Sequence, residues 1–169
     1  MEQNRERALH LKVAENENEY IGSFSLVHDV YSEMGVMEKK KNGMRVSVFN
    51  TLPSTKVLVL RNGREIASTM TLIFDSELGL PSDDLFREEI DAFRRKGLRI
   101  LEVGAFASRK DVREQNPRIA IELCKAAIGF ADYADVDILI AGVNPKYTRI
   151  YRKMLGFDFV GEPKEYPKV

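Results

Sequence analysis

The first pattern along the chain is an apolar stripe at helical spacing. Its members recur at steps of four and three: Tyr20, Phe24, Val27, Tyr31 and Met34. This spacing predicts a helix from about Glu15 to Met34 with one buried face, after a short apolar stretch at Ala8 to Val13. Gly35 ends the helix, and the lysine-rich segment Glu38 to Arg45 predicts a solvated or mobile loop.

Two β-strands joined by a tight turn follow this loop. Lys56 to Leu60 is rich in β-branched residues and leucine, and Ile66 to Phe74 returns antiparallel. The Asn62-Gly63 pair between them favours a type I′ hairpin turn. Ser82 then predicts the cap of a short helix that Gly97 closes, because serine accepts hydrogen bonds from the first helical amides.

The second half of the chain has the order strand, buried helix, strand. Leu98 to Phe106 and Val136 to Ala141 are apolar strands. Between them, Asn116 as N-cap and Pro117 at the first helical position start a helix that reaches about Tyr133. This order predicts a parallel βαβ crossover.

A last helix, Pro145 to Leu155, and a final strand complete the predicted elements. One face of this helix carries Tyr147, Ile150, Tyr151 and Met154. In order, the elements predict an α/β fold with one mixed sheet and helices on both faces, in three layers.

Length and charge narrow the class of protein. A chain of 169 residues that is 44% hydrophobic predicts a single domain over residues 1–169. The 26 basic and 26 acidic side chains balance, so no overall field draws the protein to nucleic acid or to an anionic membrane. Met1 to Arg7 begins no signal peptide and no apolar run approaches about 18 residues, so we expect a cytoplasmic protein without integral membrane association.

The residue types that bind metals or form covalent intermediates are sparse. His10 and His28 are far apart, and Cys124 is alone in an apolar stretch, where we expect a buried small hydrophobe. The sequence therefore predicts no metal site and no Cys-His nucleophile.

The last motif of the chain resembles that of the GNAT acyltransferase superfamily, which reads Asn, a helix with a tyrosine, then Gly-Phe. Asn144, Tyr151 and Gly156-Phe157 supply it, with one extra residue between Tyr151 and Gly156. A narrower resemblance, to the N-acyl amino acid synthase (FeeM-like) core, spans roughly residues 20 to 163. It rests on these segments: Leu26 to Tyr31 with Gly35, Thr69 to Pro81, Asp84-Leu85-Phe86, Arg94, Arg99 to Val103, and Val143 to Phe157.

This family is related to acyl-homoserine-lactone synthases, and the resemblance implies transfer of a fatty acyl group from acyl carrier protein to an amino acid. Such a reaction needs a donor for the thioester carbonyl, a base and an acid. The resemblance favours Glu102 as base or ammonium anchor, but the residues alone equally allow a solvent-facing glutamate. Tyr151 is the candidate acid, with an ordinary core tyrosine as the alternative.

The donor arm is expected beside Val103, Gly104, Ala105 and Phe106, with Asn144 nearby. Arg109 to Ala120 has no glycine, so it forms a poor pyrophosphate cradle, while Arg113 and Asn116 suit a single phosphate. This favours acyl-phosphopantetheine on acyl carrier protein over acyl-CoA. Basic residues expected near that entrance suit an acidic carrier, or are simply solvated: Arg109, Lys110, Arg113, Arg118, Lys146, Arg149 and Lys153.

The candidate acyl pocket consists of four apolar residues, each of which is first a core candidate: Phe24, Tyr31, Leu72 and Phe74. Two features depart from the family pattern. Val103-Gly104-Ala105 replaces the usual Ser-Arg pair, and the chain stops at Tyr166 to Val169, where the family usually continues into a further strand. Two alternatives therefore stand beside the first: an acetyl-CoA-dependent N-acetyltransferase, and a non-catalytic GNAT-like module that binds a lipid or carrier protein.

Overall fold

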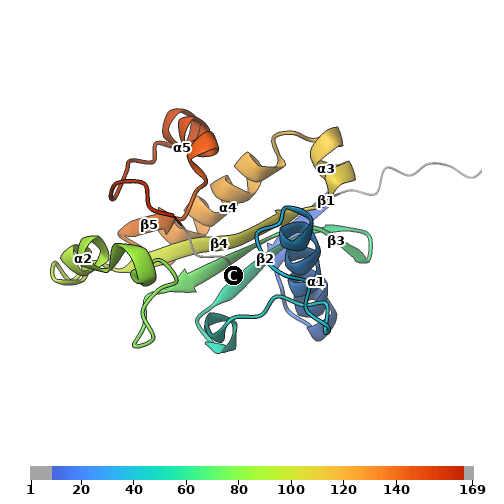
Figure 1. The fold of residues 1–169 in the computed structure, drawn as a ribbon, viewed down its shortest axis with the longest axis horizontal. Helices are drawn as coiled ribbons and strands as arrows, with labels where there is room; N and C mark the ends of the chain where they lie inside the picture. Colours follow the sequence, from blue (N-terminus) through green and yellow to red (C-terminus); the bar gives the residue numbers. More distant parts are fainter. Residues whose placement is uncertain (1–8, 166–169) are drawn as a thin grey trace, which may run out of the picture.

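Five strands form one sheet in the computed structural model, which describes residues 9–165 (Figure 1). The strands lie in chain order: β1 (Leu9–Val13), β2 (Lys56–Asn62), β3 (Glu65–Phe74), β4 (Ile100–Ser108) and β5 (Ile138–Ala141). All neighbours pair antiparallel except β4 and β5, which pair parallel as predicted. The polar N-terminus Met1 to Arg7, Ala8 and the last residues, Tyr166 to Val169, lie outside the described residues.

Helices connect the strands: α1 (Glu17–Glu33), α2 (Asp83–Arg94), α3 (Lys110–Gln115), α4 (Ile119–Tyr133) and α5 (Thr148–Leu155), with 3-10 turns η1 (Val48–Thr51) and η2 (Pro145–Tyr147). Asn16 caps α1, because its side-chain oxygen accepts a hydrogen bond from the Glu19 amide. None of the helices in residues 9–165 has the length and apolar content that a membrane crossing requires.

Helices cover both faces of the sheet, which confirms the predicted three layers (Figure 1). On one face, α3 and α4 pack on a core that includes Leu72, Leu101 and Leu123. On the other face, α1 packs through Val27 and Val30, and α2 packs through Ile90. Alternation along each strand sends successive side chains to these two cores.

Three local predictions are wrong. The hairpin turn is Gly63-Arg64, with a positive φ only at Gly63, which fits type II′ and not type I′. Asn116 does not cap α4, because a separate short helix, α3, precedes it and α4 begins at Ile119. No strand follows α5 within the described residues, which extend to 165.

The last helix and the basic loop also differ from expectation. Tyr147, Ile150 and Met154 are exposed, and from this helix Tyr151 and Leu155 pack against the core. Within the predicted loop, the Lys40 amide donates a hydrogen bond to buried His28, so this segment is anchored to α1.

Candidate functional site

Glu102 lies in β4 and is buried, with 4% of the residue exposed. Its neighbours Leu101 and Val103 belong to the core under α4, so alternation places Glu102 on the face covered by α1 and α2. The carboxylate accepts hydrogen bonds from the Ser82 amide at 3.0 Å and from the Ser82 hydroxyl at 2.8 Å. The alternative of a solvent-facing glutamate is therefore wrong.

Ser82 is a site residue that the sequence did not reveal. It is the N-cap residue of α2, as predicted, but its hydroxyl makes no capping hydrogen bond and donates to Glu102 instead. The two residues are 20 positions apart and belong to different elements, so no periodicity along the chain predicts their contact.

Burial raises the pKa of Glu102 to about 7, against the lowering effect of the two Ser82 hydrogen bonds and with a smaller rise from the charge of Asp83. Both protonation states are therefore populated near neutral pH. A carboxylate in this state is matched to accepting a proton from an ammonium group and releasing it again.

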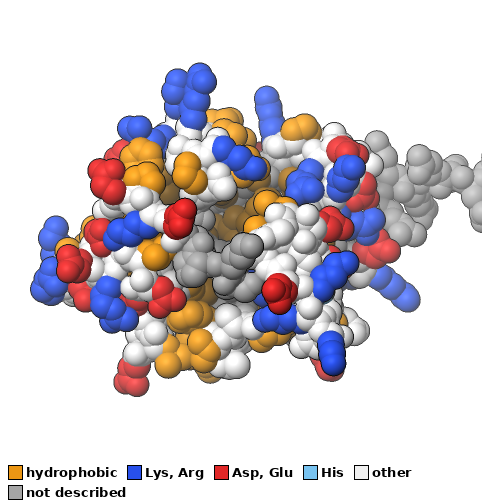
Figure 2. Space-filling model, viewed as in Figure 1, with side chains coloured by type: hydrophobic (Ala, Val, Ile, Leu, Met, Phe, Trp, Pro, Cys, Tyr) orange, Lys and Arg blue, Asp and Glu red, His pale blue; other side chains and the backbone are white. Residues whose placement is uncertain are grey.

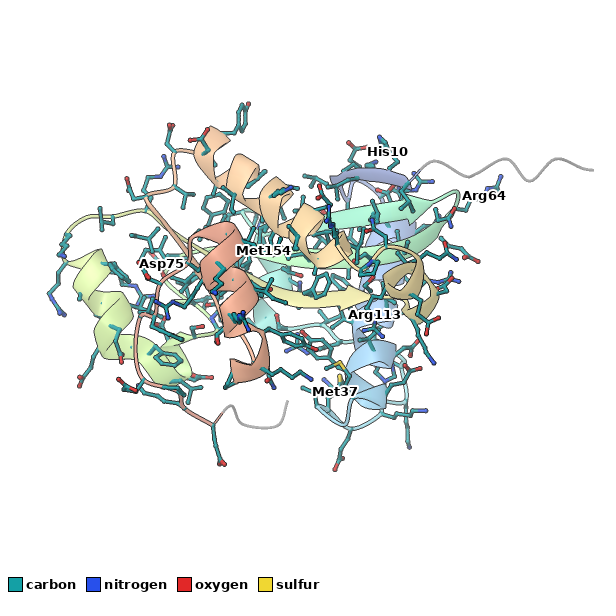
Figure 3. The ribbon with its side chains drawn as sticks, turned by 90° about the horizontal axis from the view of Figure 1, so that it is seen from above. His10, Met37, Arg64, Asp75, Arg113 and Met154 are labelled. Atoms are coloured by element: carbon teal, nitrogen blue, oxygen red, sulfur yellow. The ribbon has the colours of Figure 1, made fainter. Side chains whose placement is uncertain are left out.

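The loop that carries Ser82 is held by an ion-pair cluster centred on Arg94. Its guanidinium donates to Asp75 at 2.7 Å, to Asp83 at 2.8 Å and to Asp91 at 2.7 Å. In Figure 3, Asp75 lies beside α2. Burial opposes ionisation of Asp83, but Arg94 and the Leu80 amide hold its pKa below the usual value. The cluster therefore fixes the segment that supplies both Ser82 donors.

Open space lies next to Glu102 along the same strand. A Cβ atom placed on Gly104 would meet no atom within 4 Å, and alternation puts Gly104 on the Glu102 face. Space beside a buried carboxylate gives room for a substrate group.

A β-bulge follows Gly104. Thr71 pairs with Gly104 and Thr69 pairs with Ala107, so Ala105 and Phe106 together oppose a single residue of β3. Ala105 has φ 48°, a left-handed conformation that a non-glycine residue adopts only at a cost. Such a bulge takes backbone groups out of the regular ladder, and these groups are suited to hold a thioester carbonyl.

Pairing between β4 and β5 ends at Val103 and Ala141, although β4 continues to Ser108. The two strands part at this point, which leaves the bulge without a paired strand on that side. Tyr31 packs near Ala105 from α1, while Tyr151 packs on the α4-side core. The two helical layers, one on each face of the sheet, therefore each carry a tyrosine, Tyr31 and Tyr151.

Tyr151 is half-buried and accepts a hydrogen bond from the Cys124 thiol at 3.8 Å. Burial, then the nearby Cys124 and Tyr31, raises the pKa of Tyr151 above its ordinary value. The phenol is therefore protonated at neutral pH, and its raised pKa also makes it a weaker acid than an exposed tyrosine.

The residues predicted for the donor arm are spread over several elements. Val103 is buried and Phe106 packs beside it under α4, while Arg113 is exposed on α3 (Figure 3). Asn116 accepts from the Arg118 amide, and Asn144 caps η2 by accepting from the Lys146 amide. Of the predicted residues, the four from Val103 to Phe106 share strand β4 with Glu102.

The four predicted acyl-pocket residues are not brought together. Leu72 and Phe74 share the α4-side core with Tyr151, whereas Phe24 and Tyr31 belong to two separate clusters under α1. Leu72 is fully buried by its neighbours. Their role in binding an acyl chain stays a prediction.

Among residues 9–165, no group of three or more His, Cys, Asp or Glu side chains is arranged to hold a metal ion. The arrangement that the structure does show is a buried carboxylate beside open space, a bulged strand end and a protonated phenol. These groups match the requirements of acyl transfer to an amine.

Comparison with known proteins agrees with this chemistry. The model of one family, described as N-acyl amino acid synthase FeeM, matches residues 22–169. The structure of FeeM, an N-acyl amino acid synthase from uncultured soil microbes, is 25% identical with a TM-score of 0.81, over 95% of this chain and 84% of that chain. No curated protein matches.

More distant structures share the fold alone. An acetyltransferase from Trypanosoma brucei is 13% identical with a TM-score of 0.63, over 96% of this chain and 100% of that chain. Glucosamine-6-phosphate N-acetyltransferase from Arabidopsis thaliana is 10% identical with a TM-score of 0.62, over 94% and 98% of the two chains. The GNAT fold predicted from the sequence is confirmed.

Proposed function

We propose, from the premise that this chain belongs to the N-acyl amino acid synthase FeeM family, that it moves a fatty acyl group from acyl carrier protein to the amino group of an amino acid. That the chain is an N-acyltransferase follows from its family and fold. The identity of the donor and of the acceptor is our proposal. The observation that carries it is the buried carboxylate of Glu102, with a pKa of about 7, beside the open space at Gly104.

In the proposed reaction, Glu102 takes a proton from the acceptor ammonium. The amine lone pair then attacks the thioester carbonyl, the C–N bond forms and the C–S bond breaks. Tyr151 protonates the departing thiolate, and the nitrogen loses its second excess proton to solvent, so the product keeps one amide N–H. Glu102 then releases its proton and the Tyr151 phenolate takes one up, both by exchange with solvent. Backbone groups at the bulge of Ala105 and Phe106 support the carbonyl oxygen as negative charge develops on it.

Two features support a carrier-protein donor. At the start of α4 the Ile119 amide donates to the Asn116 carbonyl, and no side chain caps the amides that follow, so these suit one phosphate of a phosphopantetheine arm. A groove of about 520 Å³ lies beside α5 and contains Arg149, Arg152 and Lys153 with Asp158 as its one carboxylate. Figure 2 shows Lys and Arg side chains gathered over this helix. An acidic protein surface is the partner that this charge favours.

The basic residues predicted on α3 contribute less uncompensated charge to a docking surface than those on α5. Arg109 pairs with Glu65 and Asp111, and Lys110 lies 3.9 Å from Glu114, so their charges are partly compensated. The docking surface that we propose is therefore centred on α5 and not on α3.

The donor is tested by supplying acylated carrier protein, the matching long-chain acyl-CoA, and acetyl-CoA in parallel reactions with a panel of amino acids. We expect N-acyl amino acids from the carrier arm, detected by mass spectrometry, with apo carrier protein as control. Product from acetyl-CoA alone would show that the protein is an acetyltransferase and would overturn the proposed donor. Carrier binding without product in any arm would show a non-catalytic module.

Replacement of Tyr151 by phenylalanine is expected to lower kcat about tenfold. The effect is modest for a general acid because thiols have a pKa of about 8.5, so the leaving group needs little protonation. Steady-state kinetics with Tyr147→Phe, an exposed tyrosine four residues earlier, provides the control. An unchanged kcat in Tyr151→Phe would leave this residue with a packing role only.

A further inference from the structure

Arg45 is a half-buried arginine in the segment between α1 and η1. Its backbone amide donates a hydrogen bond to the Phe24 carbonyl at 3.1 Å, which anchors the segment to α1. Its guanidinium carbon lies 5.3 Å from the centre of the Tyr31 ring, an arrangement that supports the cation through the ring face. The side chain is thus held in place and is not a freely moving surface charge.

No carboxylate lies within ion-pair distance of Arg45 among residues 9–165, and the same holds for Arg152, which stacks on Phe159 in the α5 groove. Arg61, Arg94 and Arg109 each pair with at least one acidic side chain. A guanidinium has five donors in a planar fork, and stacking on an aromatic ring leaves the edges of that fork available to an anion. Arg45 therefore has the properties of a prepared carboxylate site.

Contacts connect this site to the candidate active site. Tyr31, on which Arg45 stacks, packs in one cluster with Ala105 at the bulge of β4. Gly104 directly precedes the bulge and faces open space, and Glu102 lies two residues earlier on the same face. Glu102 and Gly104 thus lie on the face of β4 that α1 and α2 cover, and Arg45 stacks on the α1 tyrosine that packs in the same cluster as Ala105.

We infer that Arg45 binds the carboxylate of the acceptor amino acid while Glu102 receives its ammonium group. This inference rests on the proposed function and specifies how the acceptor is selected. An α-amino acid carries its two opposite charges on neighbouring carbons, so a base and a guanidinium together recognise both. Amines without a carboxylate lack the second contact and are poor acceptors.

The test compares acceptors that share a side chain: an amino acid, its primary amide and the corresponding decarboxylated amine. We expect Arg45→Met to lower kcat/KM for the amino acid about 10- to 100-fold, mainly through KM, because charge-assisted hydrogen bonds contribute about 1.5–3 kcal/mol. The amide and the amine should change less than about twofold, since neither offers a carboxylate. Arg45→Lys should retain part of the preference, because it keeps the charge but loses the fork.

Arg64→Met, in the exposed hairpin turn, is the matched control and should behave as wild type. If Arg45→Met lowers kcat/KM equally for all three acceptors, or does not lower it at all, the inference about Arg45 is overturned. The proposed function still stands in that case, provided that the wild type forms product. Absence of product from wild type with every acceptor would instead overturn the proposed function. Calorimetry with an N-acyl amino acid and its primary amide gives a readout that does not need turnover: wild type should prefer the acid about tenfold or more, and Arg45→Met should lose this preference.

Discussion

Glu102→Gln is expected to lower kcat about 10²- to 10⁴-fold, because the variant cannot accept the proton of the acceptor ammonium. Glutamine has nearly the same shape and can keep both contacts with Ser82: its oxygen accepts from the amide and its NH₂ donates to the hydroxyl. The loss therefore reports the proton transfer and not a distorted site. Glu77→Gln, an exposed glutamate before α2, is the control and should retain wild-type kinetics.

The pH profile provides the stronger test of the same residue. Only the ionised carboxylate acts as a base, so wild-type kcat/KM should rise with pH through about 7, the pKa of Glu102. The free acceptor amine also loses its proton at higher pH, and this part of the profile should survive in Glu102→Gln. A rise through pH 7 that persists in Glu102→Gln would show that another group is the base.

The same pKa has a consequence for stability. The pKa of Glu102 rises from 4.5 to about 7 on folding, so the folded state favours the protonated form. The contribution of Glu102 to the free energy of unfolding is fully present below pH 4.5 and is lost as the pH rises through about 7. The difference between these two limits is about 3 kcal/mol. Glu102→Gln carries no such charge, so denaturant unfolding should show it more stable than wild type at pH 8 and similar at pH 4.

Arg94→Met should destabilise the protein by about 3–5 kcal/mol, because it leaves Asp83 buried without its cation. For a chain of this size the melting temperature should fall by roughly 10 °C. Activity should fall as well, since the Arg94 cluster holds the segment that places Ser82 against Glu102. Thermal unfolding monitored by circular dichroism measures the first effect.

The neighbouring Arg95 offers a matched control. It is exposed and has no side-chain partner among residues 9–165, so Arg95→Met should change stability by less than about 0.5 kcal/mol. Adding Asp83→Asn to Arg94→Met should restore part of the stability by removing the buried charge. Equal melting temperatures for Arg94→Met and Arg95→Met would show that the cluster does not contribute to stability.

The order and type of most elements could be predicted from the sequence. The apolar stripe that includes Val27 predicted the buried face of α1, and the apolar run that ends at Phe74 predicted β3. These predictions are possible because side chains repeat at different periods in a helix and in a strand. Local signals failed where several competed. Asn116-Pro117 is a strong helix start in isolation, but the chain already turns helical at Lys110, so α4 begins later.

The candidate site could be predicted only in part from the sequence. Alternation alone assigned Glu102 to the face opposite Leu101, and the resemblance to an acyltransferase family singled it out. Its burial, its Ser82 partner and the pKa that follows depend on a segment 20 residues away, which no spacing in the chain reveals. The acyl pocket shows the opposite outcome, because residues that looked equivalent in sequence, Phe24 and Leu72, pack in different cores.

The sequence by itself determined the fold class, the parallel crossover and the family, since periodicity and motif order are properties of neighbouring residues. Only the tertiary structure decided which charges are compensated. Arg94 and Arg45 are each one arginine in a polar stretch, yet three carboxylates surround the first and an aromatic ring supports the second. The physical reason is that solvation and electrostatic partners are set by contacts across layers, and these contacts exist only after the chain has folded.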